Sequence, residues 1–163
     1  MTKVLTIYPE KCTGCKTCEL ACSLSHEGEV NPEKSRIRIT AFENVGIYVP
    51  LVCQQCVIAS CSSVCLVKAV QQDLKTGAYI VNENCARCKL CVYACPRGAM
   101  MFIKEKGAAT CDLCNGDPLC VKVCSKHAIE YVESDKISRV ENKEGVSKLL
   151  KLLFSEAGVP NNP

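Results

Sequence analysis

Short apolar runs separated by turn residues dominate the hydrophobic pattern along this chain. Residues 3–8 form an apolar run that ends at Pro9, which is typical of a short strand. Residues 36–42 alternate apolar and polar side chains and residues 46–52 form a second apolar run, so together they predict a hairpin. Three further strands are predicted over residues 78–81, 100–103 and 129–132.

A different pattern begins after residue 133. Residues 134–145 are polar and charged and predict a linker. Apolar side chains then recur at helical spacing until the stop signals Gly158 and Pro160, which predicts an amphipathic tail helix. Its apolar positions are Val146, Leu149, Leu150 and Leu153. Two roles stay open for this helix: packing against its own domain, or docking on a partner subunit or on another copy of the chain.

Sixteen cysteines stand among these predicted elements and fall into four groups of four. Each group opens with C-x2-C and closes with a cysteine four residues after its third member. The first and third groups share the C-x2-C-x2-C-x3-C run that holds a [4Fe–4S] cube in bacterial ferredoxins, and the others lengthen only the middle gap. The groups are Cys12, Cys15, Cys18, Cys22; Cys53, Cys56, Cys61, Cys65; Cys85, Cys88, Cys91, Cys95; and Cys111, Cys114, Cys120, Cys124. Four thiolates per cube predict four [4Fe–4S] clusters with no cysteine left over.

Two other fates of cysteine-rich chains fit this spacing less well. A secreted disulfide framework is disfavoured because the chain is long for one. Residues 1–20 also contain no apolar signal-peptide stretch, which predicts a reducing compartment and a cytoplasmic protein. A structural zinc site is disfavoured because its two C-x2-C pairs usually lie a dozen or more residues apart. Here the third cysteine of each group follows the second far more closely.

Composition agrees with an interior that is partly inorganic. The chain has no Trp and only 5% aromatic residues, so the organic core is thin and folding should be coupled to cluster insertion. The formal charge is +3 with neutral cysteines, but each oxidised cube with its thiolates adds about −2, which brings the loaded protein to about −5. This charge disfavours nucleic-acid binding. No run of 18 apolar residues occurs, which predicts that the chain has no transmembrane segment.

No acid–base dyad, nucleophile–base pair or glycine-rich phosphate loop stands out, so no catalytic residue is predicted. The two histidines, His26 and His127, each follow a cluster cysteine closely. A redox-linked proton site is conceivable at either, but ordinary hydrogen bonding or solvent exposure is favoured because no convergent carboxylate is evident in the sequence. Lysines beside the ligands are expected to offset the cluster charge or to face a partner: Lys16, Lys89, Lys122 and Lys126.

Three segments carry a family resemblance: "KCTGCKTCELACSLSHEGEVNPEKSRIR", "NENCARCKLCVYACPRGAM" and "CDLCNGDPLCVKVCSKHAI". With the order of the four groups, they resemble the four-cluster electron-transfer subunits of anaerobic oxidoreductases. That family includes the small subunits of dimethyl sulfoxide reductase, formate dehydrogenase and formate hydrogenlyase. It also includes those that accompany tungsten aldehyde oxidoreductases and carbon monoxide dehydrogenases. The resemblance covers roughly residues 3–132 and does not extend to the tail.

The resemblance implies an α+β fold of two nested ferredoxin-like modules, each binding two [4Fe–4S] clusters. The outer module would span residues 1–50 and 105–133 and the inner one residues 51–104, while residues 134–163 would add the linker and the tail helix. Each cube would take three cysteines from one group and the last cysteine of the paired group. The implied sets are Cys12, Cys15, Cys18 and Cys124; Cys22, Cys111, Cys114 and Cys120; Cys53, Cys56, Cys61 and Cys95; and Cys65, Cys85, Cys88 and Cys91.

One departure from the usual ferredoxin pattern concerns the residue after each closing cysteine. Only Cys95 is followed by proline, Pro96. Ser23, Leu66 and Ser125 stand at the other three positions. Because proline turns the chain and lacks an N–H, its absence is expected to alter hydrogen bonding near three clusters and to shift their potentials.

The resemblance implies a non-catalytic electron-transfer subunit. The expected catalytic partner is a tungsten or molybdenum aldehyde-type oxidoreductase, because the compact length and the "CELACSLSHEGEVNP" opening look most like subunits of that group. A ferredoxin or a flavin subunit would be the second redox partner. The alternatives are a nickel carbon monoxide dehydrogenase partner and a free polyferredoxin. An iron–sulfur redox sensor is the alternative from a different class, and the lack of a DNA-binding motif disfavours it.

Overall fold

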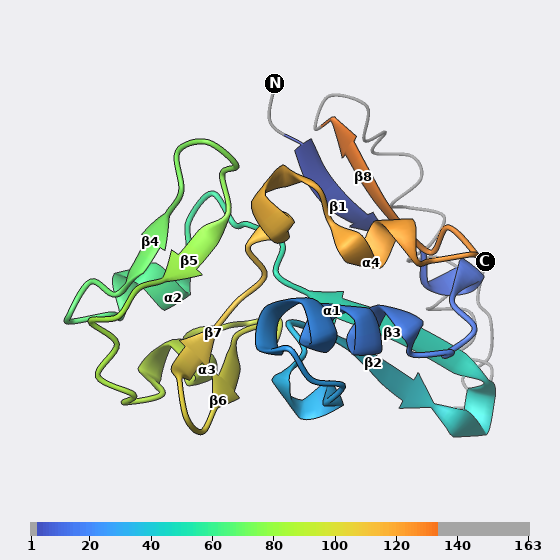
Figure 1. Cartoon of the computed structure of the whole chain (residues 1–163), viewed down its shortest axis with the longest axis horizontal. Helices are drawn as coiled ribbons and strands as arrows, with labels where there is room; N and C mark the ends of the chain where they lie inside the picture. Colours follow the sequence, from blue (N-terminus) through green and yellow to red (C-terminus); the bar gives the residue numbers. More distant parts are fainter. Residues whose placement is uncertain (1–2, 134–163) are drawn as a thin grey trace, which may run out of the picture.

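The strands pair as four separate two-stranded antiparallel ladders within residues 3–133, the part of the chain that the computed structural model describes (Figure 1). The pairs are β1 (Lys3–Ile7) with β8 (Ile129–Glu133), β2 (Ile37–Phe42) with β3 (Ile47–Val52), β4 (Val70–Gln72) with β5 (Tyr79–Val81), and β6 (Met101–Ile103) with β7 (Gly107–Ala109). The six predicted strands and the hairpin are confirmed. The three-residue strands β4 and β7 were not predicted, and the predicted tail helix lies outside the described residues.

Each α-helix begins inside a cysteine group, where the ligand loop ends. The helices are α1 (Thr17–Glu27), α2 (Ser60–Ser63), α3 (Leu90–Ala94) and α4 (Leu119–Lys122). Short 3-10 turns occupy Pro9–Lys11, Pro32–Lys34, Glu43–Val45 and Leu113–Gly116. Helix α1 is the longest and is capped at its C-terminus by Gly28, whose φ of 72° is a left-handed conformation that glycine adopts without strain. Within residues 3–133 no helix has the length and apolar character that crossing a membrane requires.

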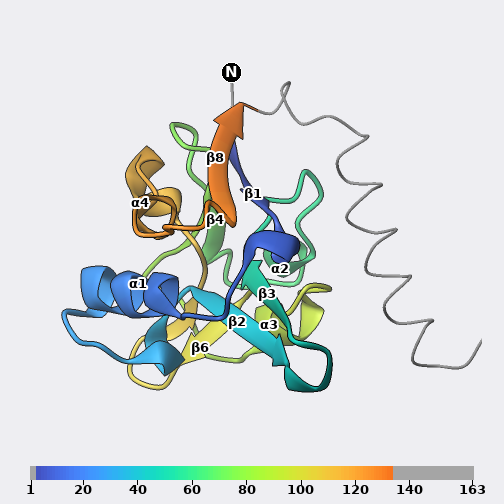
Figure 2. The ribbon, with the colours of Figure 1, turned by 90° about the vertical axis from the view of Figure 1, so that its right-hand side faces the viewer.

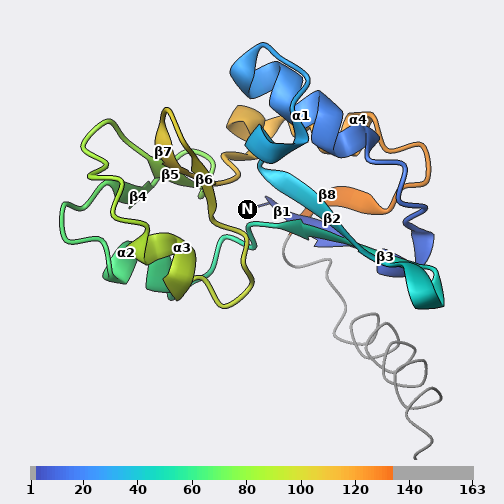
Figure 3. The ribbon, with the colours of Figure 1, turned by 90° about the horizontal axis from the view of Figure 1, so that it is seen from below.

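The two ends of the described chain meet in one ladder. Strand β1 pairs with β8 from Lys3 opposite Glu133 to Ile7 opposite Ile129, and Figure 2 shows the two strands side by side. Helices α1 and α4 are in contact, as are α2 and α3. Figure 3 shows α2 and α3 together in one half of the molecule and α1 with α4 in the other. The first cysteine group therefore lies near the fourth, and the second near the third.

Buried side chains form two main clusters that correspond to these halves. One combines Leu5, Ile37, Val52, Leu113 and Ile129 with Cys18, Cys22, Cys111 and Cys120. The other combines Ala59, Val70, Tyr79, Met100 and Ala108 with Cys91. Cysteines and small residues occupy places that large apolar side chains fill in most domains. The mixed α and β content of the prediction is confirmed, and the composition of the core agrees with the thin organic interior expected from the sequence.

Candidate iron–sulfur sites

Four cysteines from the two ends of the chain line a cavity between the first ligand loop and the start of β8. Its sulfur-bearing residues are Cys12, Cys15, Cys18 and Cys124, and Ile39, Pro50 and Ile129 are among the apolar residues beside them. Burial raises the pKa of Cys12, and the neighbouring thiols of Cys15 and Cys124 raise it further. Cys15 differs because hydrogen bonds from Thr17 lower its pKa. The cavity thus gathers the first of the four expected ligand sets.

A second cavity lies in the other half of the molecule. Its cysteines are Cys53, Cys56, Cys61 and Cys95, with Tyr79, Met100 and Thr110 in the same lining. Burial raises the pKa of Cys53, and the nearby thiols of Cys56 and Cys95 act in the same direction. This cavity gathers the third expected set, again with the closing cysteine contributed by the paired group.

Six of the remaining eight cysteines lie in the two buried clusters, Cys22, Cys111 and Cys120 in one and Cys65, Cys85 and Cys91 in the other. Burial raises the pKa of Cys120 to about 12, and the thiols of Cys114 and Cys22 add to this effect. Burial likewise raises the pKa of Cys91, and the neighbouring thiols of Cys85, Cys65 and Cys88 act in the same direction. Such like-charge effects act over short distances. The structure therefore brings members of the second expected set near one another. It does the same for members of the fourth set.

The donor set of these sites fits iron–sulfur clusters. Over the described residues, neither cavity has a histidine or a carboxylate in its lining, so the only strong metal donors there are thiols. Burial raises the pKa of Cys18 to about 12 and that of Cys61 to about 11, so both stay protonated at neutral pH until a metal displaces the proton. Soft all-sulfur donor sets of four are the ligands of [4Fe–4S] clusters.

Three of the four closing cysteines share one hydrogen-bond pattern. The sulfur accepts a backbone N–H from an alanine four residues later, with N···S distances of 3.2 to 3.3 Å. The pairs are Cys65 with Ala69, Cys95 with Ala99, and Cys124 with Ala128. The residue before each alanine has a positive φ: Lys68, Gly98 and His127. This left-handed residue turns the chain so that the alanine N–H points back at the sulfur.

This pattern narrows the expectation about the missing prolines, which stays a prediction for the cluster potentials. Cys65 and Cys124 lack a following proline yet keep the same N–H···S bond as Cys95, which precedes Pro96. The left-handed turn supplies the geometry, so proline is not required. Only Cys22 differs: α1 continues past it, and its sulfur accepts the N–H of Arg36 at 3.3 Å instead.

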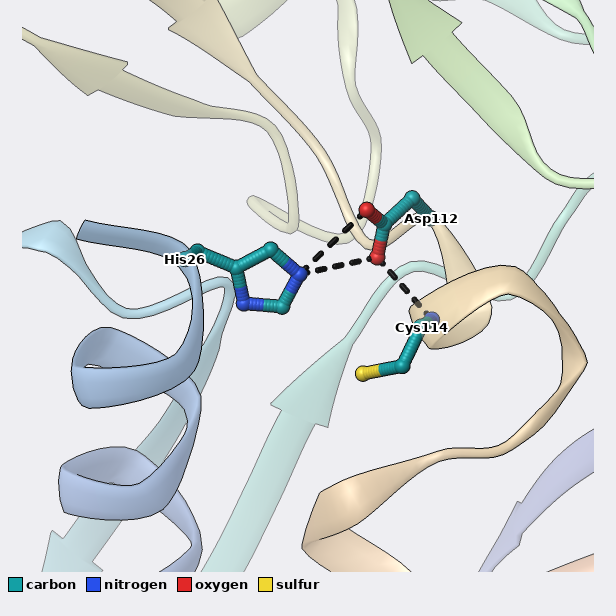
Figure 4. Close-up of side chains that lie close together, drawn as sticks. All are labelled: His26, Asp112 and Cys114. Carbon is teal, nitrogen blue, oxygen red and sulfur yellow. Dashed lines mark hydrogen bonds and ion pairs between the residues drawn. The ribbon is translucent and has the colours of Figure 1, made fainter. Parts of the chain in front are cut away.

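A charged network lies beside Cys22, and Figure 4 shows two of its members, His26 and Asp112, with Cys114. His26 Nδ1 lies 2.8 Å from the Cys22 carbonyl oxygen, and His26 Nε2 lies 3.0 Å from Asp112 Oδ1. Both ring nitrogens face acceptors, so both carry hydrogen and the imidazole is a cation. The hydrogen bond to Asp112 raises the pKa of His26 to about 12. Arg36 Nη1 donates to Asp112 Oδ2 at 2.7 Å and completes the network.

The carboxylate of Asp112 is the centre of this network. Burial alone would raise its pKa, but hydrogen bonding to His26 and the charge of Arg36 hold the pKa of Asp112 below its ordinary range. Asp112 Oδ1 also accepts the backbone N–H of Cys114 at 3.0 Å. The expectation that no carboxylate converges on a histidine is wrong for His26, whose Nε2 contacts Asp112. Asp112 follows Cys111 directly, but no sequence spacing relates it to a histidine 86 residues away.

The ligand atoms of His26, Asp112 and Cys114 lie within 4.8 Å of one another, close enough to hold a metal ion. Cys114 is already an expected cluster ligand, and both other side chains are satisfied by ion pairs and hydrogen bonds. We therefore interpret the group as the polar surroundings of a cluster. His127 is exposed, which agrees with the ordinary role favoured from the sequence.

The four lysines beside the ligands are all exposed. Lys89 lies over the Phe102 ring, 4.4 Å from its centroid, and Lys122 pairs with Asp117. Lys16 and Lys126 stand in the lining of the cavity that holds Cys15. They place positive charge around a site that carries negative charge when loaded.

Replacing Asp112 with Asn should destabilise the outer ligand loops. Asparagine keeps the shape of the side chain, and its oxygen still accepts the backbone N–H of Cys114. However, it leaves the largely buried cations of His26 and Arg36 without their counter-charge. We expect a loss of about 2 kcal/mol. The temperature at which the cluster absorbance bleaches under anaerobic conditions measures it. The control is Asp117→Asn, whose exposed ion pair with Lys122 should contribute less than about 1 kcal/mol. Equal shifts in the two variants would contradict this account of the network.

Comparison with known proteins supports iron–sulfur binding. The 4Fe-4S dicluster domain family matches residues 44–134, and the 4Fe-4S binding domain family matches residues 5–23. The two matches and the sixteen cysteines fit four [4Fe–4S] clusters.

Curated relatives are electron carriers by name. The chain is 47% identical over 123 residues to the aliphatic sulfonate oxidoreductase, polyferredoxin-like subunit of Pyrococcus furiosus, covering 74% of this chain and 70% of that protein. It is 34% identical over 164 residues to the electron transport protein HydN of Escherichia coli, and the match covers 86% of this chain and 93% of that protein. Among solved structures, the active site complex BamBC of benzoyl coenzyme A reductase with benzoyl-CoA contains a chain that matches with a TM-score of 0.50. That chain shares 27% identity, and the match covers 92% of this chain and 89% of that one. The protein belongs to the 4Fe-4S dicluster family and is an iron–sulfur electron-transfer protein related to the small subunits of oxidoreductases.

Proposed function

We propose that the chain is the electron-transfer subunit of an oxidoreductase complex, built as two nested ferredoxin-like modules. The outer module comprises residues 1–50 and 105–133, and the inner one residues 51–104. The observation that supports this most strongly is the lining of the two cavities. Each combines three cysteines of one group with the closing cysteine of another, Cys124 in one case and Cys95 in the other.

The second and fourth ligand sets follow from the same rule. In the proposed arrangement Cys22 completes the set of Cys111, Cys114 and Cys120, and Cys65 completes the set of Cys85, Cys88 and Cys91. The electrostatic influence of Cys22 on Cys120, and of Cys65 on Cys91, supports both assignments. All sixteen thiols are used, which leaves no open iron position for substrate chemistry.

The four sites follow one another in a row. Cys120 is influenced by Cys18, so the first outer site adjoins the second. Cys111 is influenced by Cys53, so the second outer site adjoins the first inner one. Thr110, in the lining of the inner cavity, directly precedes Cys111 and joins these two sites along the chain. Cys91 packs in one buried cluster with Cys61 and Cys95, which supports contact between the two inner sites. The proposed row therefore runs from the set containing Cys15, through the sets containing Cys111 and Cys53, to the set containing Cys88.

A bound [4Fe–4S] cluster supplies reversible one-electron transfer. The protein residues hold the four sites in fixed order, exclude water with the apolar linings, and direct N–H groups at the sulfurs of Cys22, Cys65, Cys95 and Cys124. Such hydrogen bonds tune cluster potentials. Among the four closing cysteines only Cys22 contacts the network of His26, Asp112 and Arg36, so we expect its cluster to differ most from the other three.

The proposed catalytic partner is a tungsten or molybdenum pterin oxidoreductase of the aldehyde type, in a cytoplasmic complex. The relative from Pyrococcus furiosus is named as a subunit of a sulfonate oxidoreductase, which supports a place in a complex of this general kind. A ferredoxin or a flavin subunit would exchange electrons at the other end. A nickel carbon monoxide dehydrogenase is the alternative catalytic partner.

Iron and acid-labile sulfide analysis of anaerobically purified protein tests the four-cluster proposal. We expect about sixteen irons and sixteen sulfides per chain, because four cubes use all sixteen cysteines. Zinc measured on the same sample is the control for a structural-metal alternative. A value of about eight irons with stoichiometric zinc would refute the proposal.

A further inference from the structure

Thr110 carries a buried hydroxyl in the lining of the inner cavity. The residue is only 4% exposed, and its Oγ1 finds no nitrogen or oxygen partner within residues 3–133. A buried hydroxyl without a partner costs free energy, so native proteins almost always provide one. Sulfur is the acceptor that this cavity offers, because four cysteines share its lining with Thr110: Cys53, Cys56, Cys61 and Cys95.

Among these four sulfurs, that of Cys53 lies beside the Thr110 hydroxyl. Burial raises the pKa of Cys53, and the hydroxyl of Thr110 acts in the opposite direction, as a donor close to the sulfur does. A cysteine that ligates a metal is a thiolate, and a charged acceptor binds a donor more strongly than a neutral one does. A loaded site therefore offers Thr110 a better acceptor than the free thiol.

The backbone on either side of this contact is fixed by Gln55. Its Nε2 donates to the carbonyl oxygen of Cys111 at 2.8 Å, and its Oε1 accepts the N–H of Tyr79 at 2.8 Å. Gln55 stands in the same ligand loop as Cys53 and has a φ of 48°, which residues other than glycine rarely adopt. The two hydrogen bonds hold the loop in this conformation and tie it to the segment that carries Thr110. Thr110 and Cys53 are thus kept together by contacts that involve no sulfur atom.

Thr110 also stands where the two proposed modules meet. It directly precedes Cys111, an expected ligand of the second outer site, and it lines the cavity of the first inner site. In the proposed row, an electron that crosses between the modules passes this joint. Reduction adds negative charge to the sulfurs of a cluster, so a hydrogen bond to a ligand sulfur stabilises the reduced form more than the oxidised form. Such a bond raises the reduction potential of the site that receives it.

We propose that Thr110 raises the reduction potential of the first inner site by donating its hydroxyl hydrogen to the sulfur of Cys53. When one electron passes between the modules, the second outer site is oxidised by one electron and the first inner site is reduced by one. The proton stays on Thr110 Oγ1 throughout, and its bond to the sulfur strengthens as the electron arrives. This inference rests on the proposed function and adds to it the residue that controls the step between the two modules.

Three variants of the full chain test the proposal. Thr110→Val removes the donor while keeping the shape of the side chain, and Thr110→Ser keeps the donor. Thr6→Val is the matched control, because Thr6 on β1 also has a buried hydroxyl without a partner in residues 3–133 but lines neither cavity. Iron is counted in each anaerobically purified protein, and the clusters are titrated with dithionite under electron paramagnetic resonance. The signal that Cys61→Ser alters identifies the first inner site.

We expect Thr110→Val to keep its irons while the ratio of reduced to oxidised first inner site, at a fixed applied potential, falls about tenfold, which is about 59 mV for one electron. Thr110→Ser and Thr6→Val should keep the wild-type potential. An unchanged potential in Thr110→Val would overturn the proposal, as would an equal fall in either of the other variants. Loss of iron from Thr110→Val would assign the hydroxyl to the assembly of the site and also overturn it. Failure of the proposed function is distinguishable, because the wild-type chain would then lack its irons.

Discussion

Replacing Cys124 with Ser should alter the same cluster as replacing Cys18, although more than a hundred residues separate them. Cys124 lines one cavity with Cys12, Cys15 and Cys18, so the closing cysteine of the fourth group completes the set of the first. A serine oxygen is a poorer iron ligand than a thiolate, so that cluster should be lost or change its spectrum. Electron paramagnetic resonance of each reduced variant should show the same missing or altered signal.

Cys120→Ser is the control that makes this comparison decisive. Cys120 lies only four residues before Cys124 and is influenced by Cys18 across the boundary between two sites. In the proposed arrangement it holds a different cluster, with Cys22, Cys111 and Cys114. Its variant should therefore give a different spectrum from that of Cys124→Ser. If Cys18→Ser and Cys120→Ser share one altered signal instead, the nested pairing of the groups is wrong.

The cysteine groups and most of the strands could be predicted because their signals are local. Ligand spacing within a group reflects the reach of one loop around one cluster. Alternation over residues 36–42 likewise reflects one strand with one buried face, and the structure pairs it with β3 as expected. By contrast, β4 and β7 have three residues each, which is too short for a periodic pattern to develop.

Features that depend on contacts between distant segments could not be predicted. Asp112 joins His26 and Arg36 through contacts that span 86 and 76 residues, and a single sequence holds no record of such a meeting. The N–H···S bonds at the closing cysteines were not predicted, for a related reason. A left-handed residue such as Lys68 or His127 provides the turn there. Lysine gives no signal of that conformation, and the preference of histidine for it is too weak to predict a turn.

Gly14 illustrates the same limitation and leads to a sharp prediction, because only the structure shows what lies beside it. The residue stands between Cys12 and Cys15 with a φ of 69°. A Cβ placed there would lie 2.4 to 2.8 Å from three ring carbons of Tyr48 on β3. One of these carbons is Cγ at the base of the ring, so turning the ring about its own axis does not relieve the overlap. In the Gly14→Ala variant, either the ligand loop or Tyr48 must move.

Gly14→Ala should therefore cost the protein its first cluster, lowering the iron content from about sixteen to about twelve per chain. The matched control is Gly46→Ala, which has nearly the same φ of 66° but no atom within 4 Å of the added methyl. Both variants carry the strain of alanine in a left-handed conformation, roughly 1 to 2 kcal/mol, and only Gly14→Ala adds the collision. Iron analysis should separate them, with Gly46→Ala keeping its full complement. If both variants retain all their irons, the ligand loop tolerates displacement by Tyr48. If both lose the same number, backbone strain rather than the contact with Tyr48 explains the effect.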